Sequence, residues 1–247
     1  MLAQDCLIVA LDVPTFQEAK QVITKLKNVV NFFKVGSQLY TSVGPKIVEF
    51  IKDKGAKVFL DLKFHDIPNT VAKASEAAVK LGVDMFNLHT LGGFEMMECA
   101  AKTVWNMVQN QEKRRHPIVL GVTILTSVDD VTLKEVIGVS ERTIEEEVLL
   151  LAGLAQSAGL DGVVASPQEI AGIKKKCGQE FIVLTPGIRP SGIELNDQKR
   201  VMTPGEAIKV GADYLVVGRP ITKAKDPIET VQSILKEIEN AESGRNS

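Results

Sequence analysis

The sequence has few of the features that mark secreted or membrane proteins. Its 247 residues contain 3 cysteines, Cys6, Cys99 and Cys177, and no Cys-x-x-Cys pair. Reduced thiols in a reducing compartment are the simplest interpretation, so we expect a cytoplasmic protein. No apolar run approaches the length that spans a bilayer, and residues 1–12 lack the basic leader of a signal peptide. We therefore expect no membrane partner.

The net charge is also small, and histidines are few. The formal net charge is −2, so the chain offers no basic field for nucleic acid, and an anionic ligand must meet a local basic site. The 3 histidines form no His-x-His or His-Glu-x-x-His spacing, so we expect no zinc site. No Gly-x-Gly-x-x-Gly follows the first apolar run, which disfavours a dinucleotide-binding fold.

Short apolar runs alternate with longer amphipathic segments along the whole chain. The expected strands are Cys6–Leu11, Phe32–Gly36, Val58–Leu62, Met85–Leu88, Ile118–Ile124, Gly162–Ala165, Phe181–Leu184 and Tyr214–Val217. Helical spacing of apolar residues marks, among others, Phe16–Leu26, Pro45–Lys54, Val71–Leu81, Phe94–Val108, Ile144–Ala158 and Ile228–Ile238. Eight such units predict an α/β protein with a single-domain (β/α)8 barrel, the TIM barrel, over residues 1–239. The polar tail 240–247 is expected to be disordered.

Charged residues interrupt the apolar strands at the end where barrels of this kind hold their active sites. In the third strand, a two-residue period turns Asp61 and Lys63 toward the barrel axis. Asp12 and Lys34 end the first two strands, and Asp66 follows in the loop after the third. A purely structural ion-pair network is the alternative. Burying charges costs several kcal/mol each unless they are well partnered, so we favour a functional site.

Glycine and arginine recur after the last two strands, in Gly187-Ile188-Arg189 and Gly218-Arg219. Barrels commonly bind phosphate at these two loops, where glycine admits backbone N–H groups and arginine offers a bidentate fork. Each motif alone is compatible with a turn that carries a solvated arginine. Together they predict a phosphate site, and the polar segment Pro190–Val201 is a candidate lid.

The run from Asp61 to Thr70, Asp-Leu-Lys-Phe-His-Asp-Ile-Pro-Asn-Thr, contains the signature Asp-x-Lys-x-x-Asp of the orotidine 5'-phosphate decarboxylases, and the chain resembles that family. The similarity also covers Leu7–Asp12, Lys34–Gly36, Thr123–Ser127, Thr185–Arg189 and Val217–Ile221, and thus nearly the whole chain. The resemblance implies conversion of orotidine 5'-phosphate to uridine 5'-phosphate and CO2 in de novo pyrimidine biosynthesis, without a cofactor or metal.

The resemblance also implies individual roles. Lys34, Asp61, Lys63 and Asp66 would form an alternating charge array, with Lys63 as the proton donor to C6. Asp66, Ile67 and Thr70 would enter the neighbouring subunit's site, so a homodimer is implied. Asp12, Lys34, Asp61 and Thr70 would bind the ribose hydroxyls, Ser127 and Ser166 the pyrimidine, and Arg189, Gln198, Gly218 and Arg219 the phosphate, with Ile67, Thr126 and Pro186 as further substrate-binding residues. Serines at strand ends, however, often only cap helices.

The chemistry of the reaction agrees with this charge array. Loss of CO2 leaves an in-plane electron pair at C6 that cannot delocalise into the ring, so fixed charges must stabilise it. Lys63, flanked by acidic residues, is expected to stay protonated and to protonate C6. Two alternatives stay open. A Mg²⁺-dependent sugar-phosphate decarboxylase or aldolase of the same superfamily carries a metal-binding glutamate where this chain has Lys34. A non-catalytic nucleotide-binding barrel would bind uridine 5'-phosphate without turnover.

Overall fold

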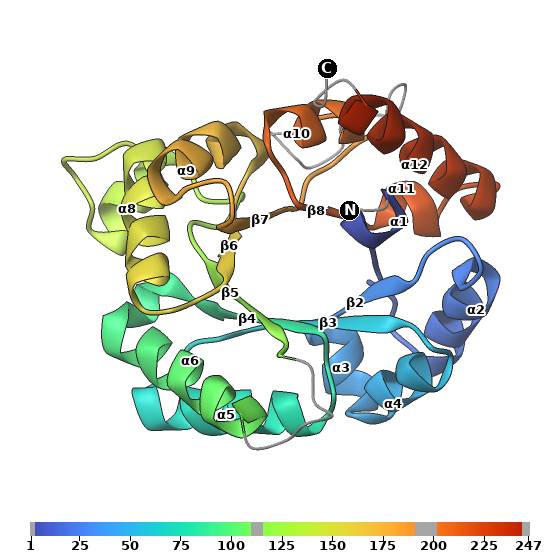
Figure 1. Ribbon diagram of the computed structural model, residues 1–247, viewed down its shortest axis with the longest axis horizontal. Coiled ribbons are helices and arrows are strands. Elements are labelled where there is room, and N and C mark those ends of the chain that lie inside the picture. Colours follow the sequence, from blue (N-terminus) through green and yellow to red (C-terminus); the bar gives the residue numbers. More distant parts are fainter. Residues whose placement is uncertain (1–2, 110–115, 191–201, 244–247) are drawn as a thin grey trace.

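A computed structural model describes residues 3–109, 116–190 and 202–243 and contains a closed barrel of parallel strands in the order β1 to β8 (Figure 1). The ring closes because β8 pairs with β1. The strands are β1 (Leu7–Ala10), β2 (Phe32–Gly36), β3 (Lys57–Phe64), β4 (Met85–His89), β5 (Ile118–Val122), β6 (Gly162–Val164), β7 (Ile182–Thr185) and β8 (Tyr214–Val217). The predicted barrel is confirmed, and each strand lies where the apolar runs placed it.

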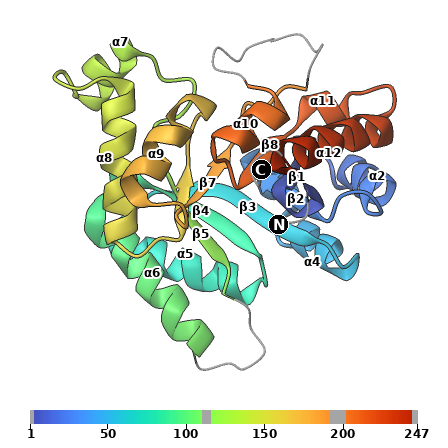
Figure 2. The ribbon, with the colours of Figure 1, turned by 45° about the horizontal axis from the view of Figure 1, so that its top comes forward.

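Helices form an outer ring around the strands (Figures 1 and 2). They are α1 (Ala3–Cys6), α2 (Phe16–Leu26), α3 (Ser37–Val43), α4 (Lys46–Asp53), α5 (Pro68–Lys80), η1 (Thr90–Gly92), α6 (Gly93–Gln109), α7 (Asp130–Thr132), η2 (Leu133–Ile137), α8 (Ile144–Ser157), η3 (Pro167–Glu169), α9 (Ile170–Cys177), α10 (Pro204–Val210), α11 (Arg219–Thr222) and α12 (Pro227–Ser243). Within the described ranges, none of these helices is long and apolar enough to cross a membrane.

The last helix differs from the sequence-based expectation. The tail was expected to be disordered from residue 240, but α12 continues to Ser243. The reason is packing, because Ala241 is buried and lies beside Gly205 of α10, where an added Cβ would come within 3.9 Å of the Ala241 Cβ. The ordered barrel domain therefore extends beyond residue 239.

Local sequence signals explain where several helices begin. Thr143 and Thr203 each form a capping box, with Glu146 and Glu206 respectively, at the start of α8 and α10. Pro68 occupies the first turn of α5, where its missing N–H leaves no hydrogen bond unmade. Only three residues therefore separate the start of helix α5 from the end of β3, the strand that carries Asp61 and Lys63.

Two separate apolar cores hold the barrel together. The interior is filled by Ile8, Ala10, Phe32, Phe59, Met85, Leu120, Leu184, Tyr214 and Val216. A larger core lies between the strands and the helices and includes Val9, Phe33, Leu60, Phe86 and Leu215. Neighbouring residues of one strand thus enter different cores, as the pleat requires. In β3, inward Phe59 is followed two residues later by Asp61, which confirms the expected alternation.

Three aspartates tie the starts of the strands together, and we call them the aspartate latches. Asp84, Asp161 and Asp213 each accept, on Oδ2, a backbone N–H bond from the second residue of β3, β5 and β7, at 2.8, 2.7 and 2.7 Å respectively. Each stands two residues after a glycine with positive φ that ends the preceding helix. The repeated Gly-x-Asp motif therefore links neighbouring strands at the N-terminal end of the barrel.

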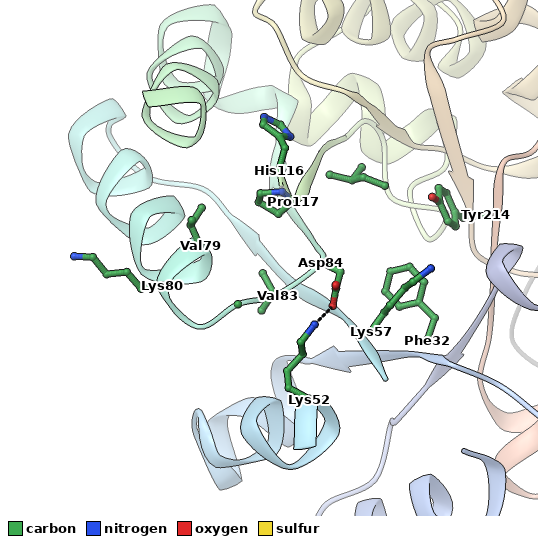
Figure 3. Close-up of a pocket in the computed structure, with 12 residues that line it drawn as sticks. Phe32, Lys52, Lys57, Val79, Lys80, Val83, Asp84, His116, Pro117 and Tyr214 are labelled. Carbon is green, nitrogen blue, oxygen red and sulfur yellow. Dashed lines mark hydrogen bonds and ion pairs between the residues drawn. The ribbon is translucent and has the colours of Figure 1, made fainter. Parts of the chain in front are cut away.

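A cavity of about 450 Å³ opens at this same end, among the first residues of β2, β3, β5 and β8 (Figure 3). Its lysines already have carboxylate partners, because Lys52 pairs with Asp84 at 2.7 Å and Lys57 pairs with Asp5 at 2.9 Å. Active sites of such barrels lie at the opposite end, after the strands. This cavity therefore lies at the N-terminal end of the barrel, whose residues serve stability, and we do not assign it to the active site.

Candidate active site

The charged residues that end the first three strands meet at the C-terminal mouth of the barrel. The Lys34 Nζ lies 3.0 Å from Asp12 Oδ1 and 3.1 Å from Asp61 Oδ2, and the Lys63 Nζ lies 2.6 Å from Asp61 Oδ1. Asp61 therefore holds one lysine on each of its carboxylate oxygens. The sequence predicted that five charged side chains converge at this mouth, and the chain brings together four of them, Asp12, Lys34, Asp61 and Lys63.

Register and a glycine bring the two strands close enough for these contacts. Gly36, the last residue of β2, pairs with Asp61 of β3. A Cβ added to Gly36 would lie 3.0 Å from the Lys34 Nζ, closer than ordinary side-chain contacts allow. The absence of a side chain at this position leaves room for the Lys34 ammonium beside Asp61.

The central pair of this cluster is buried. Side-chain exposure is 10% for Lys34 and 12% for Asp61, against 35% for Lys63 and 55% for Asp12. Burial alone would lower the pKa of Lys34, but the carboxylates of Asp61 and Asp12 outweigh it and raise that pKa above its ordinary value. Burial would likewise raise the pKa of Asp61, and the two lysines bring it below its ordinary value. Both groups are thus held in their charged forms.

Lys63 has an unusual backbone conformation. Its φ is +52°, and among the described residues every other positive φ belongs to glycine. The register between β3 and β4 shifts between Leu60 and Phe64, so Lys63 lies in an irregular stretch of the strand. A left-handed non-glycine residue costs about 1–3 kcal/mol and commonly lies at a functional site. Strain at this lysine therefore supports a role beyond stability.

Asn87 is a further residue of the site that the sequence-based reasoning missed. It is buried in the middle of β4, its Nδ2 donates to Asp61 Oδ1 at 2.7 Å, and its Oδ1 accepts from the Lys63 backbone N–H at 2.8 Å. The available signal was its position, because Met85 enters the barrel interior and the residue two positions later must point the same way. A polar residue at an inward position of an apolar strand marks a site.

Two histidines lie beside this cluster. The rings of His65 and His89 are in contact, with centroids 5.3 Å apart and ring planes tilted by 37° to each other. Burial, followed by the nearby charges of His65 and Lys63, lowers the pKa of His89. A neutral His89 therefore adds no positive charge beside Lys63 near pH 7.

A cavity of about 200 Å³ opens beside Lys34, Asp61 and Lys63. Its remaining walls are mainly apolar and consist of Phe59, Val122, Ile124, Leu125, Thr126, Val164, Ala165, Leu184, Pro186 and Val216. The predicted residues Thr126 and Pro186 therefore do line the cavity. The same cavity is therefore lined by three charged side chains and by a mainly apolar remainder, as small-molecule sites commonly are.

The predicted residues of the loop after β3 stay outside this cavity. Asp66, Ile67 and Thr70 are exposed, and Ile67 is 66% exposed. Asp66 Oδ1 accepts the backbone N–H of Ile67 at 2.7 Å, and the described part of the chain contains no ion pair between Asp66 and Lys63. A single chain therefore assembles three members of the expected array, Lys34, Asp61 and Lys63, and leaves Asp66 at the rim.

The two predicted serines lie apart from the cavity lining. Ser166 is buried and is the N-cap of η3, where its Oγ accepts the Gln168 N–H at 3.4 Å. Ser127 is exposed in the turn after β5. The capping role noted for such serines is thus observed at Ser166, and contact of either serine with a pyrimidine stays a prediction.

The predicted phosphate residues follow β7 and β8. Arg189 is buried, and its backbone N–H donates to the Met202 carbonyl at 3.1 Å. Arg219 is exposed at the start of α11, after Gly218. A Cβ on Gly218 would lie 3.4 Å from Asp12 Oδ2, so this loop borders the charged cluster. Gln198 and all but the first residue of the candidate lid, Pro190–Val201, lie outside the described residues.

The position of Lys34 argues against the metal-dependent alternative. In the described ranges, no three His, Cys, Asp or Glu side chains are grouped so that they could hold a metal ion. Asp12 and Asp61, the carboxylates nearest the cavity, are instead bridged by the Lys34 ammonium. A divalent cation at this position would have to displace that positive charge.

Comparisons with known proteins agree with this geometry. Residues 5–234 match the model of the family described as "Orotidine 5'-phosphate decarboxylase / HUMPS family". The chain is 49% identical to the orotidine 5'-phosphate decarboxylase of Moorella thermoacetica, an alignment that covers 97% of this chain and 94% of the relative. It is 54% identical to that of Syntrophotalea carbinolica, over 96% of each chain. The crystal structure of orotidine 5'-phosphate decarboxylase from Lactobacillus acidophilus is similar with a TM-score of 0.83 at 36% identity, over 94% of this chain and 98% of that one.

Proposed function

The chain belongs to the orotidine 5'-phosphate decarboxylase / HUMPS family and decarboxylates orotidine 5'-phosphate in pyrimidine biosynthesis, and we propose that it does so without a cofactor, with Lys63 as the proton donor. The observation that carries the mechanism is a single carboxylate, Asp61, paired with both Lys34 and Lys63 beside a cavity at the barrel mouth. Cys6, Cys99 and Cys177 form no disulfide with one another, which fits the cytoplasmic location expected from the sequence.

The reaction sets a demanding electrostatic task. The bond between C6 and the carboxylate carbon breaks, CO2 leaves, and the bonding electron pair stays on C6 in the plane of the ring. An uncatalysed step this slow needs a barrier reduction in the upper part of the roughly 8–23 kcal/mol range of enzymes. Such a reduction requires charges that are fixed before the reaction starts.

In this proposal, Lys63 supplies that fixed charge. Its ammonium is held at 2.6 Å from Asp61 and borders the cavity, so it can stabilise the developing negative charge on C6. It then transfers a proton to C6, which completes the product uridine 5'-phosphate and leaves a neutral amine that regains its proton from solvent. Lys34 pairs with the other oxygen of Asp61 and so restricts rotation of the carboxylate.

The apolar wall of the cavity has a complementary task. Leaving CO2 carries no net charge, and residues such as Val164, Leu184 and Val216 offer it an environment without competing hydrogen bonds. The same wall excludes water from the C6 electron pair, which strengthens each charge interaction inside the site.

We propose that the phosphate is bound by Arg189, Gly218 and Arg219, with Gln198 from the lid segment. Arginine and backbone N–H groups at the ends of β7 and β8 suit a phosphate dianion. Binding energy from this remote group can order the site around the reacting ring. The ribose hydroxyls would then lie toward Asp12 and Lys34, which border the same loop.

We also propose a homodimer in which Asp66, Ile67 and Thr70 complete the partner's site. These three residues are exposed in one chain. Leu91 and Phe94 are also exposed, and they flank Gly92, where an added Cβ would lie 3.4 Å from His65. Burial of Ile67 against a partner would remove a large exposed side chain from water. Ile67→Glu is expected to give a monomer with little activity, as measured by sedimentation together with turnover, whereas an active monomeric variant would contradict this arrangement.

The overall proposal is tested by following the ultraviolet absorbance of orotidine 5'-phosphate with purified protein. We expect full turnover after treatment with a chelator and with no added metal or cofactor. Strict dependence on Mg²⁺ would favour the metal-dependent alternative. Binding of uridine 5'-phosphate with no change in orotidylate absorbance would instead identify a non-catalytic barrel.

A further inference from the structure

We infer that Asn87 is a positioning residue, whose side-chain amide holds both the Asp61 carboxylate and the backbone of Lys63 in the arrangement that proton transfer needs. Asn87 is 1% exposed and lies inside the barrel, below the mouth. Its Nδ2 donates to Asp61 Oδ1 at 2.7 Å, and its Oδ1 accepts from the Lys63 N–H at 2.8 Å. Both ends of one amide therefore serve the two residues central to the proposed function, on which this inference rests.

The contact with Lys63 replaces a missing partner in the sheet. Regular pairing of β3 with β4 stops at Leu60 and resumes at Phe64, so Lys63 lies within the break. A buried backbone N–H needs a hydrogen-bond acceptor, and here a side chain of the neighbouring strand provides it. This bond favours the left-handed conformation of Lys63, with φ at +52°, over a regular extended strand.

That conformation determines where the ammonium lies. Side chains of a regular strand alternate between its two faces, so a change of backbone conformation at Lys63 would redirect the side chain. With the Asn87 bond in place, the Nζ instead reaches Asp61 at 2.6 Å and borders the cavity. Loss of the bond would let the backbone relax and would move the ammonium relative to the reacting carbon.

The contact with Asp61 fixes the other half of the arrangement. Asp61 Oδ1 accepts from both Asn87 and Lys63, and Oδ2 pairs with Lys34. An amide that donates to one oxygen defines the rotation of the carboxylate, so each lysine keeps its own oxygen. Asn87 is not itself among the residues that line the cavity, so it acts through Asp61 and Lys63, which are.

The chain provides a matched control at the opposite end of the barrel. Asn31 Nδ2 donates to Asp5 Oδ1 at 3.2 Å, and that carboxylate pairs with Lys57 at 2.9 Å. Asn31, Asp5 and Lys57 therefore repeat the amide, carboxylate and ammonium contacts of Asn87, Asp61 and Lys63, but they lie away from the proposed active site. Asn31→Ala reports the effect of losing such an amide on the fold alone.

The experiment compares wild type, Asn87→Ala and Asn31→Ala. Misplacement of a catalytic group by about 1 Å can lower turnover about 100-fold, so we expect a loss of that order in kcat for Asn87→Ala. Affinity for uridine 5'-phosphate should fall less than about tenfold, because the proposed phosphate residues follow β7 and β8, away from Asn87 on β4. Exchange of the C6 hydrogen of uridine 5'-phosphate with D2O, the reverse of the proposed proton transfer, should slow in parallel with kcat. Asn31→Ala should keep kcat within about twofold.

Three outcomes would overturn the inference. The first is a folded Asn87→Ala variant with kcat within about threefold of wild type. The second is an equal loss of kcat and of uridine 5'-phosphate affinity. The third is a loss of kcat with unchanged C6 exchange. If Asn87→Ala does not fold, Asn87→Asp keeps the size and the acceptor for the Lys63 N–H, replaces the amide donor by a second carboxyl group beside Asp61, and is judged by the same criteria. An inactive wild type would refute the proposed function itself.

Discussion

Replacement of Asp61 by asparagine tests how much the shared carboxylate contributes to the fold. The substitution keeps the shape of the side chain and removes the charge that neutralises Lys34 and Lys63. Leaving a buried charge without its partner costs about 3–5 kcal/mol. Lys34 would keep Asp12, and Lys63 is 35% exposed, so we expect a loss near the lower limit, about 3 kcal/mol. For a chain of this size, that loss lowers the melting temperature by roughly 6–12 °C.

The pH dependence of this difference gives a second test. The pKa of Asp61 is lowered in the folded chain, so its contribution to stability is present above its unfolded pKa, about 3.9, and is lost as the pH falls through the lower folded value. The pKa of Lys34 is raised, so its contribution is present below about 10.4 and is lost only at higher pH. The stability gap between wild type and Asp61→Asn should therefore stay constant from about pH 5 to 9 and narrow below about pH 4.

Urea unfolding, followed by circular dichroism at equal protein concentration, measures the gap directly. Asp12→Asn is the control, because Asp12 has one ion pair and a side chain that is 55% exposed. Its effect should stay below about 1 kcal/mol. Equal stability of wild type and Asp61→Asn at pH 7, or a gap that widens in acid, would refute the electrostatic account of the site.

Three further substitutions test other parts of the structure. Lys63→Ala should keep the fold and lower kcat by at least about 10⁴-fold in the orotidylate assay, and near-normal turnover would reject Lys63 as proton donor. Arg219→Ala should raise the KM about 10- to 100-fold, and unchanged kinetics would argue against a phosphate contact. Gly162→Ala should destabilise the barrel by about 3 kcal/mol or more in urea unfolding, because its Cβ would lie 2.1 Å from the Ile182 carbonyl oxygen. Gly153→Ala, where the nearest atom is the flexible end of Lys176, is the matched control and should be tolerated.

Much of the fold was predictable because apolar periodicity is a local property of the sequence. The strands and the long helices lie where the runs of apolar residues indicated, and the ends of β2 and β8 are the same in both descriptions. The two-residue period of β3 was sufficient to place Asp61 inside the barrel. Leu60 packs in the core between the strands and the helices, so the next residue, Asp61, must point to the opposite face, toward the barrel axis.

The sequence could not reveal features that depend on contacts between distant segments. The positive φ of Lys63 arises where the register between β3 and β4 shifts, and a lysine carries no local signal for that conformation. Asn87 was missed for the same reason, because its role depends on Asp61, which lies 26 positions earlier. The end of α12 was placed too early because its last turn is held by packing against α10.

The aspartate latches divide the barrel into units of two strands. They join β4 to β3, β6 to β5 and β8 to β7, and the described latches do not cross from β4 to β5 or from β6 to β7. A circularly permuted chain opened between two units would keep every latch intact within a continuous segment. One opened between β3 and β4 would place the two halves of a latch at opposite ends of the polypeptide.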